Sequence, residues 1–154
     1  SAQRKEDLRN YFTDRKSPFA DDEGVIDAFL AAKNMNLMIA ISFSESTMGQ
    51  KCYYNNCSGI GGAPGQKSWR VYPDKLAWFK DMAQLLEKPI YKERFTSCVS
   101  MNGVYNAGSK NWLRGCIQKS NELIALTKQA NDEKIALANQ PTVSTATAEI
   151  TLVD

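Results

Sequence analysis

A nearly uninterrupted apolar segment, Leu37-Met38-Ile39-Ala40-Ile41-Ser42-Phe43, constrains the fold of this chain more than any other stretch. A helix that is apolar on almost all sides is expected in the middle of a domain, where neighbouring elements cover it. A buried strand is the alternative, because short apolar runs do not distinguish the two. We favour a helix, since Met, Leu and Ala outnumber the β-branched residues and a helical pattern closely precedes the segment.

Helical spacing of apolar residues recurs on both sides of this segment. We predict further helices near residues 4–14, 21–34, 74–88, 91–101 and 109–138. The predicted helix starts are Asp21-Asp22, Asp74 and Ser109, and Asn36 is the predicted N-cap of the central helix. A chain of 154 residues suits one domain. The prediction is therefore a mainly α fold in which residues 1–140 form a single domain. Residues 141–154 are expected to be a linker or disordered tail, with a strand at 148–153 as the alternative.

The character of the chain changes between Thr47 and Pro73, where Gly, Asn and Tyr are concentrated and five of the nine glycines occur. We predict a loop here, with room for a small β-hairpin. Glu45 immediately precedes this loop. A carboxylate where a buried helix turns into a loop can have its pKa raised by partial desolvation, as a general acid requires. The alternative is an ordinary solvent-exposed glutamate at a helix end.

The four cysteines fall into two pairs that are close in sequence. We favour the disulfides Cys52–Cys57 and Cys98–Cys116, each of which would close a loop-like segment. Free thiols are one alternative, and a zinc site is another that the spacing fits poorly without histidine. Disulfides would place the protein in an oxidising compartment.

Composition excludes several classes of function. The chain contains no histidine, so Ser-His-Asp and Cys-His catalysis and His-ligated metals are ruled out. Nineteen basic and 17 acidic residues are spread along the chain without the basic stripe of a nucleic-acid-binding protein. We expect no nucleic-acid partner, no membrane span, no metal or cofactor, and a monomer. The N-terminal residues lack a signal-peptide core, so the chain is expected to be cytosolic as written or a piece of an exported protein.

The order of several short motifs resembles the lysozyme-like superfamily of peptidoglycan-cleaving enzymes, near its glucosaminidase and lytic transglycosylase branches. The resemblance covers about residues 10 to 120. The matching pieces are Ser17-Pro18, Ile26 to Phe29, Ala40-Ile41, Glu45-Ser46 with Gly49, Asn56 with Gly59-Ile60, Arg70 to Asp74 leading into Leu76 to Leu86, and Tyr105 with Trp112.

The resemblance implies a helical domain with a glycan strand lying across a groove. By analogy, Glu45 would be the catalytic acid, and Tyr105 would present its hydroxyl to Glu45 or to the sugar N-acetyl group. The positions that would contact sugar are Ser46, Asn56, Ser58, Gly59 and Ile60. The expected partner is the glycan strand of peptidoglycan, and the expected location is extracellular, periplasmic or at the cell surface.

The sequence departs from a glycosidase with two carboxylates. No Asp or Glu occurs between Ser46 and Pro73, and Asp74, the nearest candidate, already has a helix-capping role. A single acid indicates a mechanism in which Glu45 acts first as acid and then as base, while the substrate's 2-acetamido group stabilises C1. Hydrolysis and transglycosylation both remain open. The alternatives are an inactive peptidoglycan-binding or glycan-binding module, and a wall-docking component of a secretion apparatus or virion.

Overall fold

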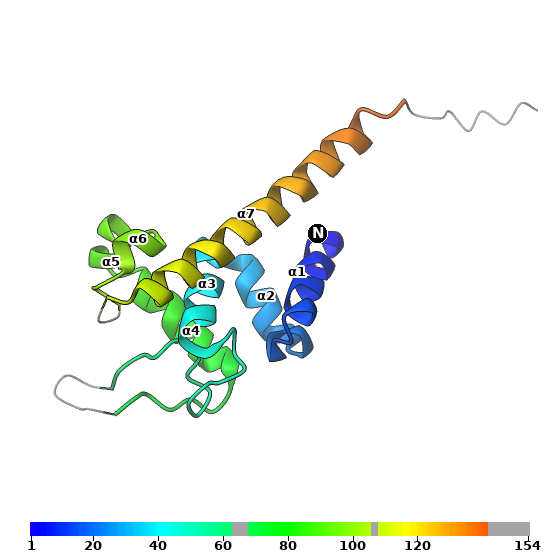
Figure 1. The fold of residues 1–154 in the computed structure, drawn as a ribbon. Coiled ribbons are helices and arrows are strands. Elements are labelled where there is room, and N and C mark those ends of the chain that lie inside the picture. The colour runs from blue at the N-terminus through cyan, green and yellow to red at the C-terminus, as the bar shows by residue number, and fades with distance from the viewer. Residues whose placement is uncertain (63–67, 106–107, 142–154) are drawn as a thin grey trace, which may run out of the picture.

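The computed structural model describes residues 1–62, 68–105 and 108–141. In these residues the chain forms seven α-helices and one 3-10 helix, and no named strand, which confirms the prediction of a mainly α fold (Figure 1). The elements in order are α1 (Ala2–Asp14), η1 (Pro18–Asp21), α2 (Glu23–Ala31), α3 (Met35–Ser46), α4 (Lys75–Leu86), α5 (Pro89–Arg94), α6 (Cys98–Met101) and α7 (Lys110–Ala138).

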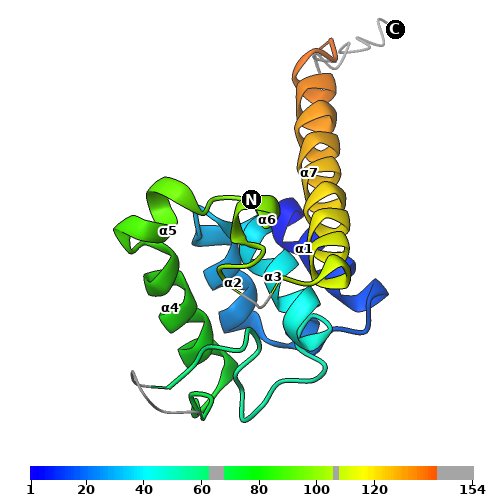
Figure 2. The ribbon, with the colours of Figure 1, turned by 60° about the vertical axis from the view of Figure 1, so that its left-hand side comes forward.

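Helix α3 is the buried central helix that the apolar segment predicts, with every residue from Leu37 to Ser42 buried. It packs mainly against the first half of α7, as both ribbon views show (Figures 1 and 2). Gly115 allows this close approach, because a Cβ there would lie 2.9 Å from Phe43 Cε1. Ser44 Oγ also donates a hydrogen bond to the carbonyl oxygen of Trp112, at 2.9 Å. The start of α7 is thereby fixed beside the end of α3.

An aromatic cluster joins the N-terminal elements to α4. Phe12 from α1, Phe19 from η1 and Phe29 from α2 contact one another edge-on or tilted, and the Phe19 ring stacks on Trp78 of α4 at 5.6 Å. All four side chains are fully buried. This cluster supplies the apolar burial that holds α1, α2 and α4 together.

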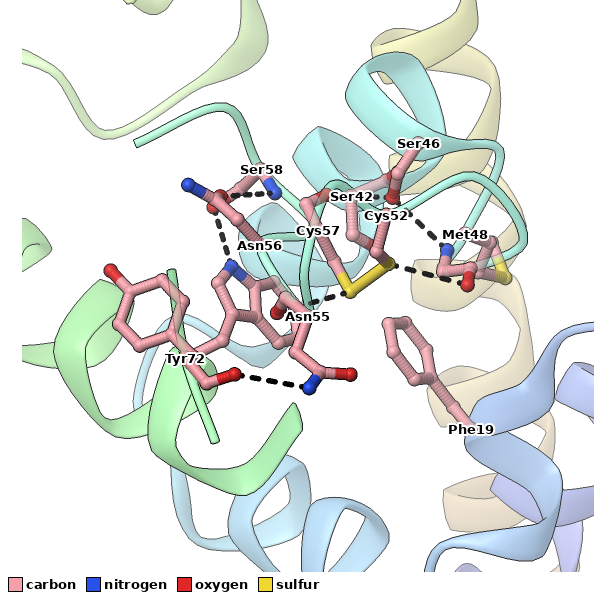
Figure 3. Close-up of a disulfide and its surroundings, with 12 residues drawn as sticks. Phe19, Ser42, Ser46, Met48, Cys52, Asn55, Asn56, Cys57, Ser58 and Tyr72 are labelled. Atoms are coloured by element: carbon pink, nitrogen blue, oxygen red, sulfur yellow. Dashed lines mark hydrogen bonds between the residues drawn. A yellow bond between two sulfur atoms is a disulfide. The ribbon is translucent and has the colours of Figure 1, made fainter. Parts of the chain in front are cut away.

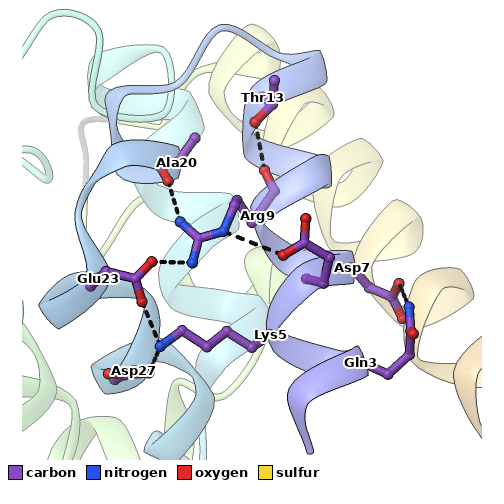
Figure 4. Close-up of polar contacts among 9 residues, drawn as sticks. Gln3, Lys5, Asp7, Arg9, Thr13, Ala20, Glu23 and Asp27 are labelled. Atoms are coloured by element: carbon purple, nitrogen blue, oxygen red, sulfur yellow. Dashed lines mark hydrogen bonds and ion pairs between the residues drawn. The ribbon is translucent and has the colours of Figure 1, made fainter.

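Ion pairs also join α1 to α2 (Figure 4). Lys5 pairs with Glu23 and Asp27, and Arg9 pairs with Glu23 while donating a hydrogen bond to the carbonyl of Ala20. Because Glu23 and Asp27 are largely exposed, these pairs add little stability.

The predicted helix starts at Asp22, Asp74 and Ser109 are confirmed, since each side chain accepts a backbone hydrogen bond from the first turn of its helix. The prediction of Asn36 as N-cap is wrong. The central helix begins two residues earlier than predicted, at Met35, with Asn34 in the N-cap position. Met35 is itself buried, so the apolar pattern extends further upstream than the run from Leu37 indicates.

The single helix predicted over residues 91–101 is two short helices, α5 and α6. Ser97 interrupts it, because its hydroxyl accepts from the backbone of Ser100 and the Ser100 hydroxyl accepts from the backbone of Ser97. This reciprocal cap starts a new helix instead of continuing the old one. Pro89 does follow the end of α4, as predicted, and it also occupies the first turn of α5.

The segment from Thr47 to Pro73 is a loop in its described part. The hairpin for which the sequence left room is reduced to two isolated antiparallel bridges, Tyr53 with Asn56 and Gly61 with Trp69. The alternative strand at 148–153 lies outside the described residues. None of the helices in the described part of the chain combines the length and the apolarity that crossing a bilayer requires.

Both predicted disulfides are present. Cys52–Cys57 closes a short segment of the loop after α3, and Cys98–Cys116 joins α6 to α7. The free-thiol and zinc alternatives for these cysteines are thereby excluded. Together the two bridges hold the loop and the start of α7, which are the elements that flank Glu45.

Candidate functional site

Glu45 lies in the last turn of α3, half-buried, where the helix gives way to the loop. Its Oε1 accepts a hydrogen bond from the indole Nε1 of Trp112, at 3.0 Å. Trp112 stands in the first turn of α7 and is buried. Glu45 is therefore positioned by the backbone of α3 and by the hydrogen bond from Trp112 of α7.

The surroundings of Glu45 raise its pKa above the ordinary value of a glutamate. Partial burial is the larger influence, because it disfavours the ionised form. The hydrogen bond from Trp112 acts in the opposite direction, since it stabilises the carboxylate. The net effect is a carboxyl group that keeps its proton to a higher pH than a solvated glutamate does.

The loop backbone approaches Glu45 at Gly59. Its φ is +67°, and a Cβ at this position would lie 3.0 Å from Glu45 Oε2 and 3.7 Å from Trp69 Cζ3. A larger residue would meet the carboxylate and would also be strained in the left-handed region. Because Gly59 has no side chain, the loop backbone can pack directly against the Glu45 carboxylate.

Tyr105 belongs to the same cluster. Its ring stacks on that of Trp112, with 6.3 Å between centroids, and its hydroxyl donates a hydrogen bond to the carbonyl of Ser58, at 2.6 Å. Burial, and in smaller part the negative charge of Glu45, raises the pKa of Tyr105 above the usual range. The phenol therefore remains a hydrogen-bond donor, and it binds the residue directly before Gly59.

Ser46 is buried in the core beside the Cys52–Cys57 disulfide (Figure 3). It is 3% exposed, and its Oγ lies 2.8 Å from the carbonyl of Ser42 and 2.7 Å from that of Cys57. Its single proton is shared between these acceptors, while the oxygen accepts from the amide of Gly49 at 3.1 Å. In this structure Ser46 anchors the loop to α3 and presents no hydroxyl to solvent.

Asn56 and Ser58 are buried in the same way (Figure 3). The Asn56 amide donates to the carbonyls of Ile60 and Arg70, at 2.8 and 3.0 Å, and its oxygen accepts from the amide of Ile60. Ser58 Oγ accepts from the indole nitrogen of Trp78, at 2.7 Å. These side chains shape the loop from within.

Of the five predicted sugar-contact residues, Gly59 alone is more than slightly exposed, because Ile60 is also buried. The structure therefore brings together Glu45, Gly59 and Tyr105, with Trp112 between the acid and the phenol. It places Ser46, Asn56, Ser58 and Ile60 behind them, as supports of the loop. Sequence reasoning could not separate these two groups, since the separation depends on distant partners such as Trp78.

Two aspartates of the α4 region are the candidates for a second acid. Asp74 is exposed and its Oδ1 accepts from the amide of Ala77, at 2.7 Å, as the capping role predicts. Asp81 accepts from the hydroxyl of Tyr72 at 2.5 Å and pairs with Arg70. Burial raises the pKa of Asp81, but these two donors outweigh it and leave the pKa below the usual value. Both carboxylates are therefore already occupied within the protein.

The sequence did not predict the positions of two tryptophans, Trp112 and Trp69, at this site. Trp112 was predicted as part of a helix face and of the family pattern, but not as the donor to Glu45. Trp69, whose ring borders Gly59, was not singled out at all. The available signal was an aromatic residue directly after a glycine-rich segment. Among the described residues, no cluster of three or more His, Cys, Asp or Glu side chains is arranged to hold a metal ion.

Hollows of about 510 and 470 Å³ occur elsewhere on the described molecule. The first lies between the start of α3, α6 and the middle of α7, and the second between α1 and the later part of α7. Neither is lined by Glu45, Gly59 or Tyr105. The chemistry of the side chains, and not the size of a hollow, identifies the candidate site.

No family model matches the chain, and searches of curated proteins and of solved structures give no significant match.

Proposed function

We propose that this protein is a glycosidase that cleaves the glycan strand of bacterial peptidoglycan, with Glu45 as the general acid. The observation that carries the proposal is the environment of Glu45, a half-buried carboxyl group with a raised pKa at the end of a buried helix. Such a group retains a proton at a pH where a solvated glutamate has lost it, and it can transfer that proton to a leaving oxygen. Its half-exposed position leaves it accessible to a substrate.

The proposed mechanism uses one protein carboxylate. Glu45 donates its proton to the glycosidic oxygen, and the carbonyl oxygen of the sugar's own 2-acetamido group bonds to C1 as the bond to the leaving sugar breaks. The ionised Glu45 then takes a proton from the attacking nucleophile. Water as nucleophile gives hydrolysis and a reducing end, whereas an internal sugar hydroxyl gives an anhydro product. The absence of Asp and Glu between residues 46 and 73 supports this mechanism.

Tyr105 and Trp112 have distinct roles in this proposal. Trp112 orients the Glu45 carboxylate and limits how far its pKa rises. Tyr105 donates to the Ser58 carbonyl and so fixes the loop at Gly59, beside the acid. A substrate acetamido group could receive the Tyr105 proton only by displacing Ser58.

Membership of the lysozyme-like superfamily and export from the cytosol are part of the same proposal. A mainly helical chain with a glutamate in the last turn of its buried central helix supports the first. Two disulfides support the second, since such bonds persist chiefly in oxidising compartments. The proposed partner is the wall itself.

The test is digestion of purified peptidoglycan by the wild type, Glu45→Gln and Asp74→Asn, with mass spectrometry of the released fragments. We expect release by the wild type and by Asp74→Asn, and a loss of at least about a hundredfold in Glu45→Gln, the range of a general acid. Anhydro ends would identify a lytic transglycosylase and reducing ends a hydrolase. Full activity of Glu45→Gln would refute the proposed mechanism.

A wall-binding module is the second candidate, favoured by the fact that the carboxylates of Asp74 and Asp81 are both engaged within the protein. A wall-binding module would release no fragments as the wild type. The wild type and Glu45→Gln would then be retained equally on sedimented peptidoglycan. The same assay therefore separates the two functions.

A further inference from the structure

Trp69 is far more exposed to solvent than the other two tryptophans of the chain. The chain has three tryptophans, of which Trp78 is 0% exposed, Trp112 is 7% exposed and Trp69 is 53% exposed. Leaving an indole in water forgoes the apolar burial that this side chain offers. An exposed tryptophan at a defined position therefore suggests a ligand that covers it.

The backbone of Trp69 is held firmly. It forms an antiparallel bridge with Gly61, flanked by hydrogen bonds from Gly62 N to Ser68 O at 2.8 Å and from Arg70 N to Ile60 O at 3.0 Å. The buried amide of Asn56 adds a bond to the Arg70 carbonyl. The indole is thus presented by a fixed backbone, so that a ligand binding there would have little main chain to order.

Trp69 also lies beside the proposed acid. The position that a Gly59 Cβ would take is 3.0 Å from Glu45 Oε2 and 3.7 Å from Trp69 Cζ3. The carboxylate and the edge of the indole therefore border the same small patch of backbone. A sugar ring whose glycosidic oxygen reaches Glu45 over this patch can therefore also contact Trp69.

We propose that Trp69 is a substrate-binding residue whose indole face stacks on the pyranose ring of the N-acetylated aminosugar next to the bond that Glu45 protonates. The inference rests on the proposed function. One face of such a ring carries C–H groups with slight positive charge, which the negative face of an indole attracts, and stacking removes apolar area of both from water. Glu45 then supplies the polar contact and Trp69 the apolar one, from two sides of Gly59.

The test uses the difference in exposure among the tryptophans. Acrylamide quenches an exposed indole far more than a buried one, so we expect Trp69, the exposed tryptophan, to account for most of the quenchable fluorescence. Full-length Glu45→Gln, which retains the site without turnover, is titrated with an N-acetylglucosamine tetramer in the presence of acrylamide. The same titration is repeated by calorimetry in the Glu45→Gln background with Trp69→Ala, Trp69→Phe and Ile135→Ala. Ile135 is a comparably exposed apolar residue near the far end of α7, and it serves as the matched control.

We expect the tetramer to protect the Glu45→Gln protein from quenching, and Trp69→Ala to bind it about tenfold more weakly, the loss of roughly one aromatic stack. Trp69→Phe should keep most of the affinity, and Ile135→Ala all of it. Unchanged quenching, or equal affinity of the Trp69→Ala protein, would overturn the assignment of Trp69. Even in that case, a loss of peptidoglycan cleavage in Glu45→Gln would still support the proposed function. Full cleavage by Glu45→Gln would refute both the proposed mechanism and the role of Trp69 that rests on it.

Discussion

At the scale of single residues, the proposed catalytic role of Glu45 conflicts with the stability of the fold. Partial burial raises its pKa, so the folded protein holds the Glu45 proton to a higher pH than the unfolded chain, where the ordinary value near 4.5 applies. The stability that this proton contributes is complete below pH 4.5 and is lost as the pH rises through the folded pKa. At pH values above its folded-state pKa, the ionised, half-buried carboxylate of Glu45 therefore destabilises the fold.

Glu45→Gln is accordingly expected to raise the melting temperature at pH values above the folded-state pKa of Glu45, while it lowers cleavage at least about a hundredfold. The gain should shrink as the pH falls toward 4, because the wild-type carboxyl is then protonated as well. Thermal unfolding followed by circular dichroism between pH 4 and 8 measures this difference. Glu93→Gln, at an exposed position on α5, is the control and should show no such trend. A gain that is equal at all pH values would contradict the burial of Glu45.

Gly59 offers a test of the geometry around the acid, since a methyl group there would lie 3.0 Å from Glu45 Oε2 on a backbone with φ of +67°. We expect Gly59→Ala to cost about 1–2 kcal/mol of unfolding free energy, the penalty for a left-handed non-glycine residue. It should also lower cleavage by displacing the carboxylate. Gly61→Ala is the control, because a Cβ there meets nothing within 4 Å. Equal effects of the two substitutions on the urea midpoint and on cleavage would argue against the close approach.

The sequence predicted the place of Glu45 correctly at this scale, because a buried helix followed by a glycine-rich loop is a local pattern. It could not predict which neighbours face the acid. Ser46 turns toward the Cys57 carbonyl and Ser58 toward the Trp78 indole, and both partners come from elsewhere in the fold. Side-chain direction in a loop depends on such tertiary contacts, and alternation or helical spacing gives no access to it.

At the scale of elements, the caps were the most predictable features, since Asp22, Asp74 and Ser109 each bond to an amide within three residues. The break between α5 and α6 was missed because Ser97 forms its reciprocal cap with Ser100, and serine is a weaker signal than glutamate at that position. The adjacent disulfide from Cys98 to Cys116 then fixes α6 against α7. Local sequence identified the cysteines but not the restart of the helix.

The two disulfides are expected to have separable effects. By loop entropy, the bridge that spans 18 residues contributes about 3 kcal/mol and the bridge that spans five contributes about 2 kcal/mol. Replacing Cys98 and Cys116 by serine should therefore lower the urea midpoint more. Replacing Cys52 and Cys57 should lower cleavage more, because that bridge lies in the loop that leads to Gly59. The opposite ranking in either assay would contradict this division between stability and site.

At the scale of the whole molecule, α7 serves two purposes along its length. Its first half is part of the core, with Trp112, Cys116 and Leu123 buried. Beyond Leu126 its described side chains are exposed. The helix extends past the other elements (Figures 1 and 2). An isolated helical end of this kind frays readily in water, because tertiary packing supplies most helical stability.

Amide hydrogen exchange should therefore divide α7 into two parts. We expect strong protection from Leu113 to Leu126 and exchange at least about a hundredfold faster from residue 131 onward, since local opening there breaks no core contact. The experiment is run at two protein concentrations tenfold apart. Ile135 and Leu137 are more than half exposed, so a second copy that covered them would slow exchange at the higher concentration. Concentration-independent exchange agrees with the predicted monomer, whereas uniform protection along α7 would mean that its far end is covered in solution.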